Sequence, residues 1–405
     1  MSKIAISEIP VSTIETFDVV VVGGGPSGAT AATDLARAGR RVLLLDKPGK
    51  IKPCGGAIPP RLIRDFAIPD ELIVARIRSA RMISPKDKRV DMPIGDGFVG
   101  MVDREHFDPW LRNRAALAGA DYRPGRFERI THDPDGLVTV HYSPVGGQPA
   151  QVRTRLVIGA DGATSAVGRT EIPGHAGMKQ VFAYHEIVRR PADGSGDVEA
   201  TRCDVYYQGK LSPDFYAWIF PHGDTISIGT GSARKGFSLR GAIRALRESS
   251  GLDAGETVRR EGAPIPLKPL KKWDNGRDVL LTGDAAGIVA PASGEGIYYA
   301  MLGGRLAAEA AEAFLVTGKA SALAQARRRF MKLHGRVFLI LGIMQWVWYR
   351  NDGLRERFVS ICKDKDVQQL TWDSYMNKEL VRAKPAAHAR IFFKDLAHLF
   401  RWVSP

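Results

Sequence analysis

Hydrophobic residues near the start of the chain form two short, continuous runs, with small residues between them. The first run, residues 19–22, ends in the glycine-rich turn that begins at Gly23, and the second, residues 42–45, ends at Asp46. A continuous apolar run of this length, bounded by turn residues, is typical of a strand buried on both faces of a parallel sheet. The sequence therefore predicts a strand, a tight glycine turn, a helix and a second strand.

Two later segments repeat this order of an apolar strand, a sharp turn and the start of a helix. Residues 156–159 are apolar and lead to Asp161. Residues 279–284 are an apolar run that ends in Gly-Asp, and a second glycine-rich stretch follows Pro291. Both segments are therefore predicted to place a polar turn at the end of a buried strand.

Shorter β-prone runs lie between these segments. They cover residues 90–101, 138–157, 204–209 and 225–231, with turn residues between them. This pattern predicts a mainly antiparallel sheet that is inserted into the first domain. A chain of 405 residues is long enough for one large domain or two closely joined domains with buried cores.

Composition narrows the class of protein. The three cysteines, Cys54, Cys203 and Cys362, lie far apart, which argues against a disulfide framework and against a Cys-x-x-Cys metal site, so no metal is expected. The first residues lack the uninterrupted apolar core of a signal peptide. We therefore expect the protein in the cytoplasm or on the cytoplasmic face of a membrane.

The net charge of +14 is concentrated toward the C-terminus, where residues 321–405 hold sixteen Lys and Arg against seven Asp and Glu. No zinc-finger spacing, basic zipper or stacking-aromatic RNA motif accompanies the charge, so nucleic acid is not an expected partner. Residues 337–344 and 346–349 are apolar and aromatic, and residues 391–403 have apolar positions at helical spacing. These segments are either docking helices of a C-terminal subdomain or helices that lie in a membrane interface, and we expect peripheral membrane association.

The first glycine turn has the chemistry of a dinucleotide site. Gly23 permits the turn out of the strand, Gly25 lets the backbone approach a pyrophosphate, and Gly28 lets the helix pack closely on the sheet. The N-terminus of the helix then presents unpaired N–H groups to the phosphates. Asp46 ends the second strand, where a carboxylate accepts hydrogen bonds from ribose hydroxyls.

The three motifs, in this order, resemble the FAD-binding proteins of the aromatic hydroxylase and geranylgeranyl reductase group. The resemblance implies that Asp284 binds the ribityl chain of FAD. It also implies that the helix after Gly294 and Gly296 points its N-terminus at N1 and O2 of the flavin, where the helix dipole stabilises the negative charge of the reduced ring.

Three further motifs resemble the geranylgeranyl reductase family, and the Ala-Ile-Pro continuation of the first resembles its chlorophyll and bacteriochlorophyll branch. Residues 52–60 read Lys-Pro-Cys-Gly-Gly-Ala-Ile-Pro-Pro, residues 212–223 contain the family's proline, tyrosine, tryptophan and Phe-Pro pattern, and residues 102–111 contain the arginine that contacts FAD in this group. Tyr216, Trp218 and Phe220 alternate, so one strand face would present three rings to an isoprenoid tail.

The resemblance implies an α/β fold with an α+β insert: a Rossmann-like FAD-binding domain of the aromatic hydroxylase type, an antiparallel β-sheet substrate domain and a helical C-terminal region. Residues 1–80, 106–170 and 271–330 are predicted to form the FAD-binding domain. Residues 81–105 are predicted to add strands to the substrate domain of residues 171–270. The basic, aromatic helical region is predicted for residues 331–405.

The activity implied is hydrogenation of three double bonds of a geranylgeranyl tail to give the phytyl chain, with NADPH reducing FAD. Geranylgeranylated bacteriochlorophyll or geranylgeranyl diphosphate would be the substrate, and a pigment-esterifying synthase a protein partner. A flavin-dependent monooxygenase and a non-catalytic prenyl-binding protein on the same scaffold are the alternatives. The sequence does not choose between the pigments or set the oligomeric state.

The site residues follow from the motifs. The predicted cofactor-binding residues are Gly23, Gly25, Pro26, Ser27, Gly28, Asp46, Lys47, Cys54, Gly55, Gly56, Ala57, Arg104, Asp161, Gly283, Asp284, Pro291, Gly294, Gly296 and Ile297. The predicted substrate-binding residues are Tyr216, Trp218, Phe220 and Pro221. Cys54 and Tyr216 are the catalytic candidates; the alternative for Cys54 is a small packing residue, and Glu295, Tyr298, His106 and His185 are further polar groups that are more often structural.

Overall fold

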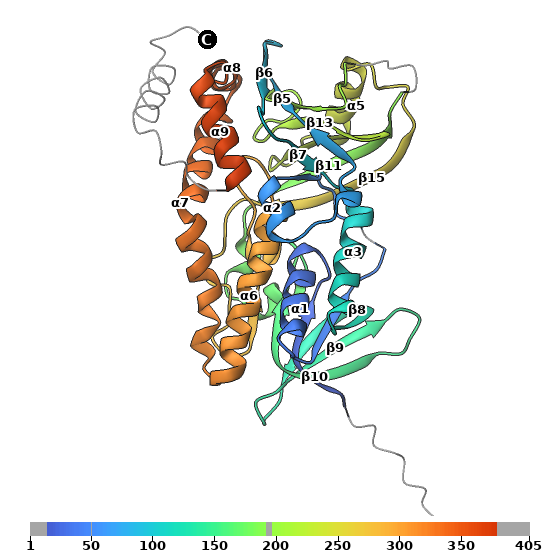
Figure 1. Cartoon of the computed structure of the whole chain (residues 1–405), viewed down its shortest axis with the longest axis vertical. Coiled ribbons are helices and arrows are strands. Elements are labelled where there is room, and N and C mark those ends of the chain that lie inside the picture. Colours follow the sequence, from blue (N-terminus) through green and yellow to red (C-terminus); the bar gives the residue numbers. More distant parts are fainter. Residues whose placement is uncertain (1–13, 50, 192–196, 379–405) are drawn as a thin grey trace, which may run out of the picture.

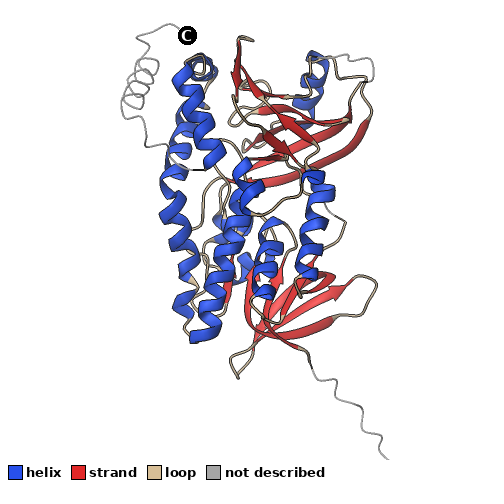
Figure 2. Cartoon of the chain, viewed as in Figure 1, coloured by secondary structure: helices blue, strands red, loops and turns tan. Residues whose placement is uncertain are grey.

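Two large sheets, one toward each end of the long axis, organise the fold, and helices lie between them and along one flank (Figures 1 and 2). The structure is a computed structural model that describes residues 14–49, 51–191 and 197–378. The strands are β1 (Thr16–Val22), β2 (Val42–Asp46), β3 (Ala57–Ile58), β4 (Ala75–Ile77), β5 (Ser79–Ile83), β6 (Arg89–Pro93), β7 (Val99–Met101), β8 (Asp121–His132), β9 (Val138–Pro144), β10 (Ala150–Gly159), β11 (Gln180–Arg189), β12 (Arg202–Tyr206), β13 (Ala217–His222), β14 (Thr225–Ser232), β15 (Thr257–Pro266) and β16 (Val279–Leu281). The helices are α1 (Pro26–Arg37), α2 (Pro60–Asp65), α3 (Arg104–Leu117), α4 (Ala166–Glu171), α5 (Leu239–Ser249), α6 (Ile297–Thr317), α7 (Ala324–Trp348), α8 (Asp352–Ile361) and α9 (Lys365–Asn377).

The first sheet contains the three predicted strand-and-turn motifs. In it, β1 pairs in parallel with β2 on one side and with β10 on the other, and β10 also pairs in parallel with β16. The four valines of β1 are buried on both faces, as the continuous apolar run predicts. Helix α1 packs between α3 and α6 above this sheet (Figure 1). The carboxyl ends of β1, β2, β10 and β16 therefore point the same way.

The second sheet has seven strands in the order β15-β11-β14-β13-β12-β5-β6. Every neighbouring pair is antiparallel except β12 and β5, which are parallel. Helix α5 covers this sheet, and Ile243 and Leu246 pack against Ile226 and Ile228 of β14. The α/β architecture with an inserted, mainly antiparallel sheet and a helical C-terminal region is confirmed.

Two of the runs expected in the inserted sheet lie elsewhere. The prediction for residues 138–157 is wrong, because β9 pairs with β8 and β10 within the first sheet. Residues 90–101 divide between sheets: β6 belongs to the second sheet, whereas β7 pairs with β3 and β4 in a small third sheet. Alternating polarity marks a half-buried strand but carries no information about its partner strand, which explains both errors.

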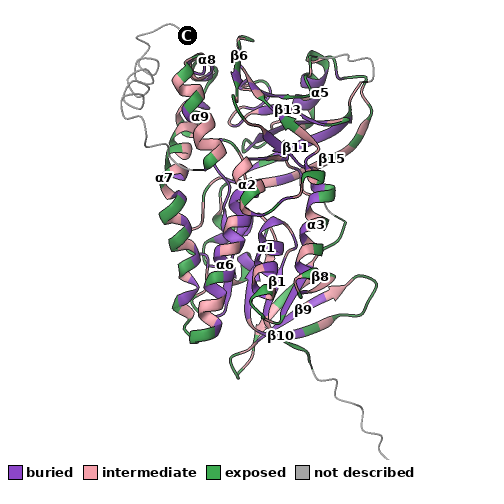
Figure 3. Ribbon diagram, in the orientation of Figure 1, coloured by how far each residue is buried: buried purple, intermediate pink, exposed green. Residues whose placement is uncertain are grey.

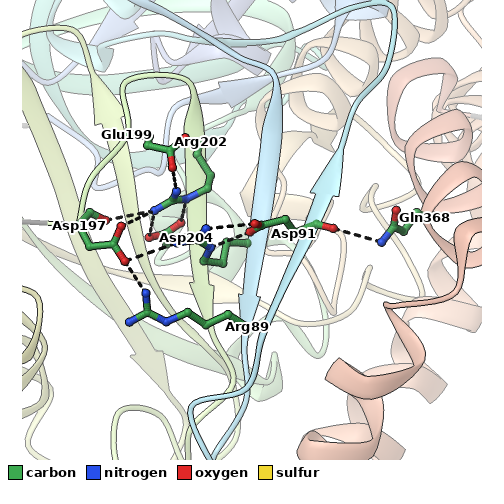
Figure 4. A network of polar contacts seen from close by, with 8 residues as sticks. Arg89, Asp91, Asp197, Glu199, Arg202, Asp204 and Gln368 are labelled. Atoms are coloured by element: carbon green, nitrogen blue, oxygen red, sulfur yellow. Dashed lines mark hydrogen bonds and ion pairs between the residues drawn. The ribbon is translucent and has the colours of Figure 1, made fainter.

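A network of charged side chains joins the edge of the second sheet to the C-terminal helices (Figure 4). On β12, buried Arg202 donates from Nε to Oδ1 of Asp204 at 2.7 Å. On β5 and β6, Arg81 donates from Nε to Oδ1 of Asp91 at 2.6 Å. Nε2 of Gln368 on α9 donates to the backbone oxygen of Asp91 at 3.2 Å. This contact attaches α9 to the second sheet.

The C-terminal helices run back along the molecule. Helix α7 lies beside α6 and reaches the end of the molecule that holds the second sheet, where α8 contacts β6 and α9 turns back toward α2 (Figure 1). The predicted apolar segments 337–344 and 346–349 fall in α7 and just after it, whereas residues 391–403 lie outside the described residues. Within the described ranges, no helix is both long enough and apolar enough to cross a membrane.

Candidate active site

The glycine turn after β1 shows which glycines serve the fold and which one faces open space. Gly23 has φ of +106°, and a Cβ there would lie 2.4 Å from the backbone oxygen of Ala160. A Cβ on Gly28 would lie 1.9 Å from the backbone oxygen of Gly23. A Cβ on Gly25 would meet only Nη2 of Arg104, at 4.0 Å. Gly23 and Gly28 are thus required by packing, whereas Gly25 leaves the N-terminus of α1 accessible to a ligand.

Asp46 at the end of β2 is held beside this turn. Its Oδ1 accepts a hydrogen bond from Gly24 N at 2.8 Å, and its Oδ2 lies 3.1 Å from Nη1 of Arg112 on α3. Burial raises the pKa of the Asp46 carboxyl, and the Gly24 N–H and Arg112 oppose that rise. The pairing with Arg112, which sequence reasoning missed, keeps a carboxylate where a ribose would lie. Lys47, the next residue, is exposed.

A cleft of about 930 Å³, its open mouth included, extends from the glycine turn to the second sheet. The predicted cofactor residues that line it are Gly25, Pro26, Ser27, Cys54, Gly55, Arg104, Asp284, Gly294, Gly296 and Ile297. The predicted aromatic residues Tyr216, Trp218 and Phe220 line it as well. The sequence motifs, although separated by up to 272 positions from Gly25 to Ile297, therefore meet at one cavity.

Other predicted cofactor residues are not part of the cleft lining, namely Gly23, Gly28, Asp46, Lys47, Gly56, Ala57, Asp161, Gly283 and Pro291. Asp161 caps α4 instead: its Oδ2 accepts hydrogen bonds from the backbone N of Ala166 at 2.7 Å and Val167 at 3.2 Å. Its neighbours Ala160 and Gly162 line the cleft in its place. The carboxylate thus shapes the turn while the backbone forms the wall.

Asp284 projects into the cleft from the turn after β16. A Cβ on Gly283, whose φ is +62°, would lie 2.7 Å from Cβ of Ser27, so only glycine lets this turn approach α1. Oδ2 of Asp284 forms an ion pair with Nζ of Lys52 from the loop after β2. Lys52 begins the motif at residues 52–60, but the sequence alone gave this lysine no role. The pair places one negative and one positive group where a ribityl chain and the flavin ring are expected.

Arg104 at the first turn of α3 is a buried cation in the cleft wall. Its Nε and Nη2 donate to the two oxygens of Asp108, at 2.6 and 2.7 Å. Burial disfavours the charge, but Asp108 and the nearby Cys54 outweigh it and raise the pKa of Arg104. The side chain therefore stays charged beside the cofactor turn.

Cys54 is half-buried in the loop before β3. Its Sγ accepts a hydrogen bond from Gly56 N at 3.3 Å and faces the cleft. A Cβ on Gly55 would lie 2.9 Å from the ring of Phe220, and a Cβ on Gly56, with φ of +72°, would lie 2.5 Å from Nε2 of His222. The two glycines thus allow the thiol to sit between the cofactor turn and β13.

The aromatic wall consists of Tyr216 and the β13 residues Trp218 and Phe220. Their ring centroids are 5.9 Å apart for the first pair and 6.2 Å for the second. Phe215, which sequence reasoning missed because it breaks the alternation, stacks on Tyr216 at 4.3 Å and also lines the cleft. Pro221 is buried on the other face of β13 and does not line the cleft, as alternation requires.

The hydroxyl of Tyr216 is already engaged. It donates to the backbone oxygen of Ser293 at 2.5 Å. Burial raises the pKa of Tyr216 well above its usual range. The ring is therefore a wall residue whose hydroxyl holds a backbone segment on the opposite side of the cleft.

FAD fits this arrangement. The open backbone at Gly25 and the N-terminus of α1 suit a pyrophosphate, Asp284 suits the ribityl hydroxyls, and the start of α6 after Gly296 faces the same cavity. One continuous cavity joins these groups to the aromatic wall of Tyr216, Trp218 and Phe220.

Comparisons with known proteins agree with this geometry. Residues 18–59 match the family described as FAD dependent oxidoreductase, and residues 75–329 match the family described as FAD binding domain. The chain is 58% identical over 389 residues to the geranylgeranyl diphosphate reductase of Rhodobacter capsulatus, covering 96% of this chain and 99% of that protein. It is 37% identical over 405 residues to the geranylgeranyl diphosphate reductase of Synechocystis, covering 95% and 98% of the two chains.

A solved structure shares the fold. The geranylgeranyl bacteriochlorophyll reductase-like protein of Thermoplasma acidophilum superposes with a TM-score of 0.74 at 23% identity, over 96% of this chain and 99% of that one. The predicted family is thus confirmed by sequence over nearly the whole length. The chain belongs to the FAD-dependent geranylgeranyl reductase family.

Proposed function

We propose that this protein is an FAD-dependent reductase that hydrogenates the three double bonds of a geranylgeranyl tail, with NADPH as the source of electrons. The observation that carries the proposal is the single cleft in which the cofactor residues Gly25 and Asp284 face the aromatic wall around Trp218. Bound FAD, once reduced, supplies the hydride that an alkene carbon accepts.

The residues of the chain position that chemistry. The N-terminus of α1 binds the pyrophosphate, and Asp284 binds the ribityl chain. The N-terminus of α6 favours negative charge on the ring that lies against it. Tyr216, Trp218 and Phe220 bind the isoprenoid chain by apolar contact and exclude water from the reacting double bond.

Hydrogenation also needs a proton at the second alkene carbon. The Tyr216 hydroxyl donates to Ser293, and its raised pKa makes it a weak acid. Cys54 lines the cleft, and its Sγ serves only as the acceptor in the hydrogen bond from Gly56 N. Of the two candidates, the geometry favours Cys54 as the proton donor.

Geranylgeranylated bacteriochlorophyll is the proposed substrate and geranylgeranyl diphosphate the second candidate. Stopped-flow spectroscopy tests the electron donor and the prenyl substrate separately. Anaerobic NADPH should bleach the flavin faster than NADH at equal concentration, and the preferred prenyl substrate should restore the oxidised spectrum. Reoxidation by oxygen alone, with a hydroxylated product, would instead support a monooxygenase, and a flavin that NADPH never bleaches would support a non-catalytic binding protein.

The proposed location is the cytoplasmic face of a membrane, with the protein peripherally bound. Exposed segments recur along α7 (Figure 3). Its exposed apolar residues include Leu339, Ile343 and Trp346, the last of which is 69% exposed. Arg350 lies over the ring of Trp346 at 5.6 Å, and Arg336 is on the same helix. Apolar and aromatic residues flanked by cations suit an anionic lipid surface.

Vesicle flotation tests the location. The protein should float with anionic vesicles, and L339E together with W346E should abolish flotation while FAD stays bound. Equal flotation of both proteins would contradict the proposal. A pigment-esterifying synthase stays the predicted protein partner.

A further inference from the structure

The flavin-facing loop, residues 291–296, is held by side chains from outside the FAD-binding segments. Tyr216, just before β13 of the second sheet, donates to the backbone oxygen of Ser293 at 2.5 Å. Tyr349, just after α7, donates to the backbone oxygen of Ala292 at 3.0 Å. The loop leads directly into α6, whose N-terminus faces the cleft. The backbone conformation of the flavin-facing loop therefore depends on the second sheet and on the C-terminal helices.

A buried ion pair makes a third contact to this loop. Lys378, the residue after α9, bonds through Nζ to Oε2 of Glu295. The two side chains are only 2% and 8% exposed. Nζ of Lys378 also lies 3.7 Å from the ring centroid of Tyr375 and faces the rings of Tyr298 and Tyr299.

Each charge of this pair depends on the other. Burial raises the pKa of Glu295 and lowers the pKa of Lys378, and in each case the partner opposes the change. Within the described residues, Oε1 of Glu295 has no hydrogen-bond partner, so Lys378 is the contact that offsets the desolvation of the carboxylate. The pair places opposite charges next to Gly294 and Gly296, both of which line the cleft.

The loop has little freedom to adopt another position. Gly294 has φ of +65°, and a Cβ there would lie 3.0 Å from the ring of Phe215. Gly294 N also donates to the backbone oxygen of Ala290 at 2.9 Å. The outside contacts therefore act on a tight turn that lies directly in the cofactor site.

We propose that Glu295 and Lys378 are positioning residues of the FAD site: their buried ion pair latches the end of α9 to the flavin-facing loop, sets its conformation and balances the charge beside the flavin ring. The C-terminal helices then help to complete the cofactor site. This inference rests on FAD binding and is independent of which prenyl substrate is reduced.

The test measures the midpoint potential of the bound flavin in two variants that each remove one charge of the pair, because the proposal predicts shifts of opposite sign. E295Q is measured over a falling pH series: below the lowered pKa of Lys378 it leaves an uncompensated cation at the loop, which stabilises the anionic reduced flavin and raises the midpoint potential. K378M is measured over a rising pH series: above the raised pKa of Glu295 it leaves an uncompensated carboxylate and lowers the potential. The double variant should return the potential toward the parent value. Each single variant should bind FAD about tenfold more weakly, the effect of roughly 1.4 kcal/mol lost at the loop.

If the pair were merely structural, the midpoint potential would shift in the same direction in both single variants, or in neither. Either result would overturn the proposal. R247M is the matched control, because Arg247 on α5 forms a buried ion pair with Glu186 on β11 of the second sheet, and neither residue lines the cleft. It should lower stability and leave the potential and FAD affinity unchanged.

A second test needs neither bound cofactor nor enzyme activity. It uses Tyr349→Phe, which removes only the hydroxyl that binds the backbone oxygen of Ala292. Hydrogen exchange in the apo-protein should become faster in residues 290–296 of Y349F and K378M, and stay at the parent rate in R247M. Unchanged exchange in both loop variants would contradict the latch. Because the apo-protein is measured, failure here is distinguishable from failure of the proposed prenyl reduction.

Discussion

Replacing Gly25 by alanine should separate cofactor binding from folding. The added methyl group would project into the cleft, where its nearest neighbour is Nη2 of Arg104 at 4.0 Å. Nothing in the described protein has to move, and backbone φ at Gly25 is −74°, a value that alanine adopts freely. The apo-protein should therefore fold with a stability within about 0.5 kcal/mol of the parent.

The same methyl group occupies space that a pyrophosphate needs at the N-terminus of α1. Overpacking by one methyl group costs typically about 1–3 kcal/mol. Since every 1.4 kcal/mol is a factor of ten, FAD should bind about ten- to hundredfold more weakly. Gly28→Ala is the contrasting variant, because its Cβ would lie 1.9 Å from the backbone oxygen of Gly23. It should destabilise the apo-protein by about 3 kcal/mol or more.

The assay measures apo-protein melting and FAD affinity side by side. Apo-protein is required because bound FAD would itself raise the melting temperature of the parent. The expected result is an unchanged melting temperature with weakened FAD binding for G25A, and a lowered melting temperature for G28A. Unweakened FAD binding by G25A would refute the placement of the pyrophosphate at this turn, and a G28A protein as stable as the parent would refute the packing argument.

Three other predictions concern single side chains. Cys54→Ala should keep FAD bound and lose turnover by at least about tenfold in a steady-state assay, as expected for loss of a proton donor; normal turnover would leave Cys54 a packing residue. Trp218→Ala should raise KM for a prenyl substrate, and an unchanged KM would remove Trp218 from the substrate site. The same variant should lose about 3–5 kcal/mol of unfolding free energy, measured with denaturant, because a nearly buried ring is lost. Burial lowers the pKa of His222 to about 4, below its unfolded value, so its contribution to stability is complete above pH 6.5 and is lost as pH falls toward 4. Between pH 7.5 and 4 the parent should therefore lose about 3 kcal/mol more unfolding free energy than His222→Asn, and equal losses would contradict a neutral, buried His222.

Local patterns were enough to predict the elements that begin the cofactor site. The run at residues 19–22, the glycines after it and Asp46 are close in sequence, and their chemistry follows from the strand-turn-helix geometry that they encode. Alternation likewise predicted that Tyr216, Trp218 and Phe220 share a face, and all three line the cleft. In the same way, Pro221 could have been assigned to the opposite face.

Contacts between distant segments were not accessible in this way. Lys52 meets Asp284 across 232 positions, and Lys378 meets Glu295 across 83. Neither lysine differs by type or spacing from the many exposed lysines and arginines of this basic chain. The sheet that accepts β9 was mispredicted for the same reason, since strand partners are set by the packed tertiary structure and not by the strand's own alternation.

The most direct test of prenyl reduction is mass spectrometry of the tail after anaerobic incubation of the FAD-loaded protein with NADPH and geranylgeranylated bacteriochlorophyll in membranes. The account predicts stepwise products that each gain two hydrogens, ending at the phytyl ester. An unchanged tail, with flavin that NADPH bleaches and that consumes oxygen rapidly once air is admitted, would contradict it and indicate oxygen chemistry on the same scaffold.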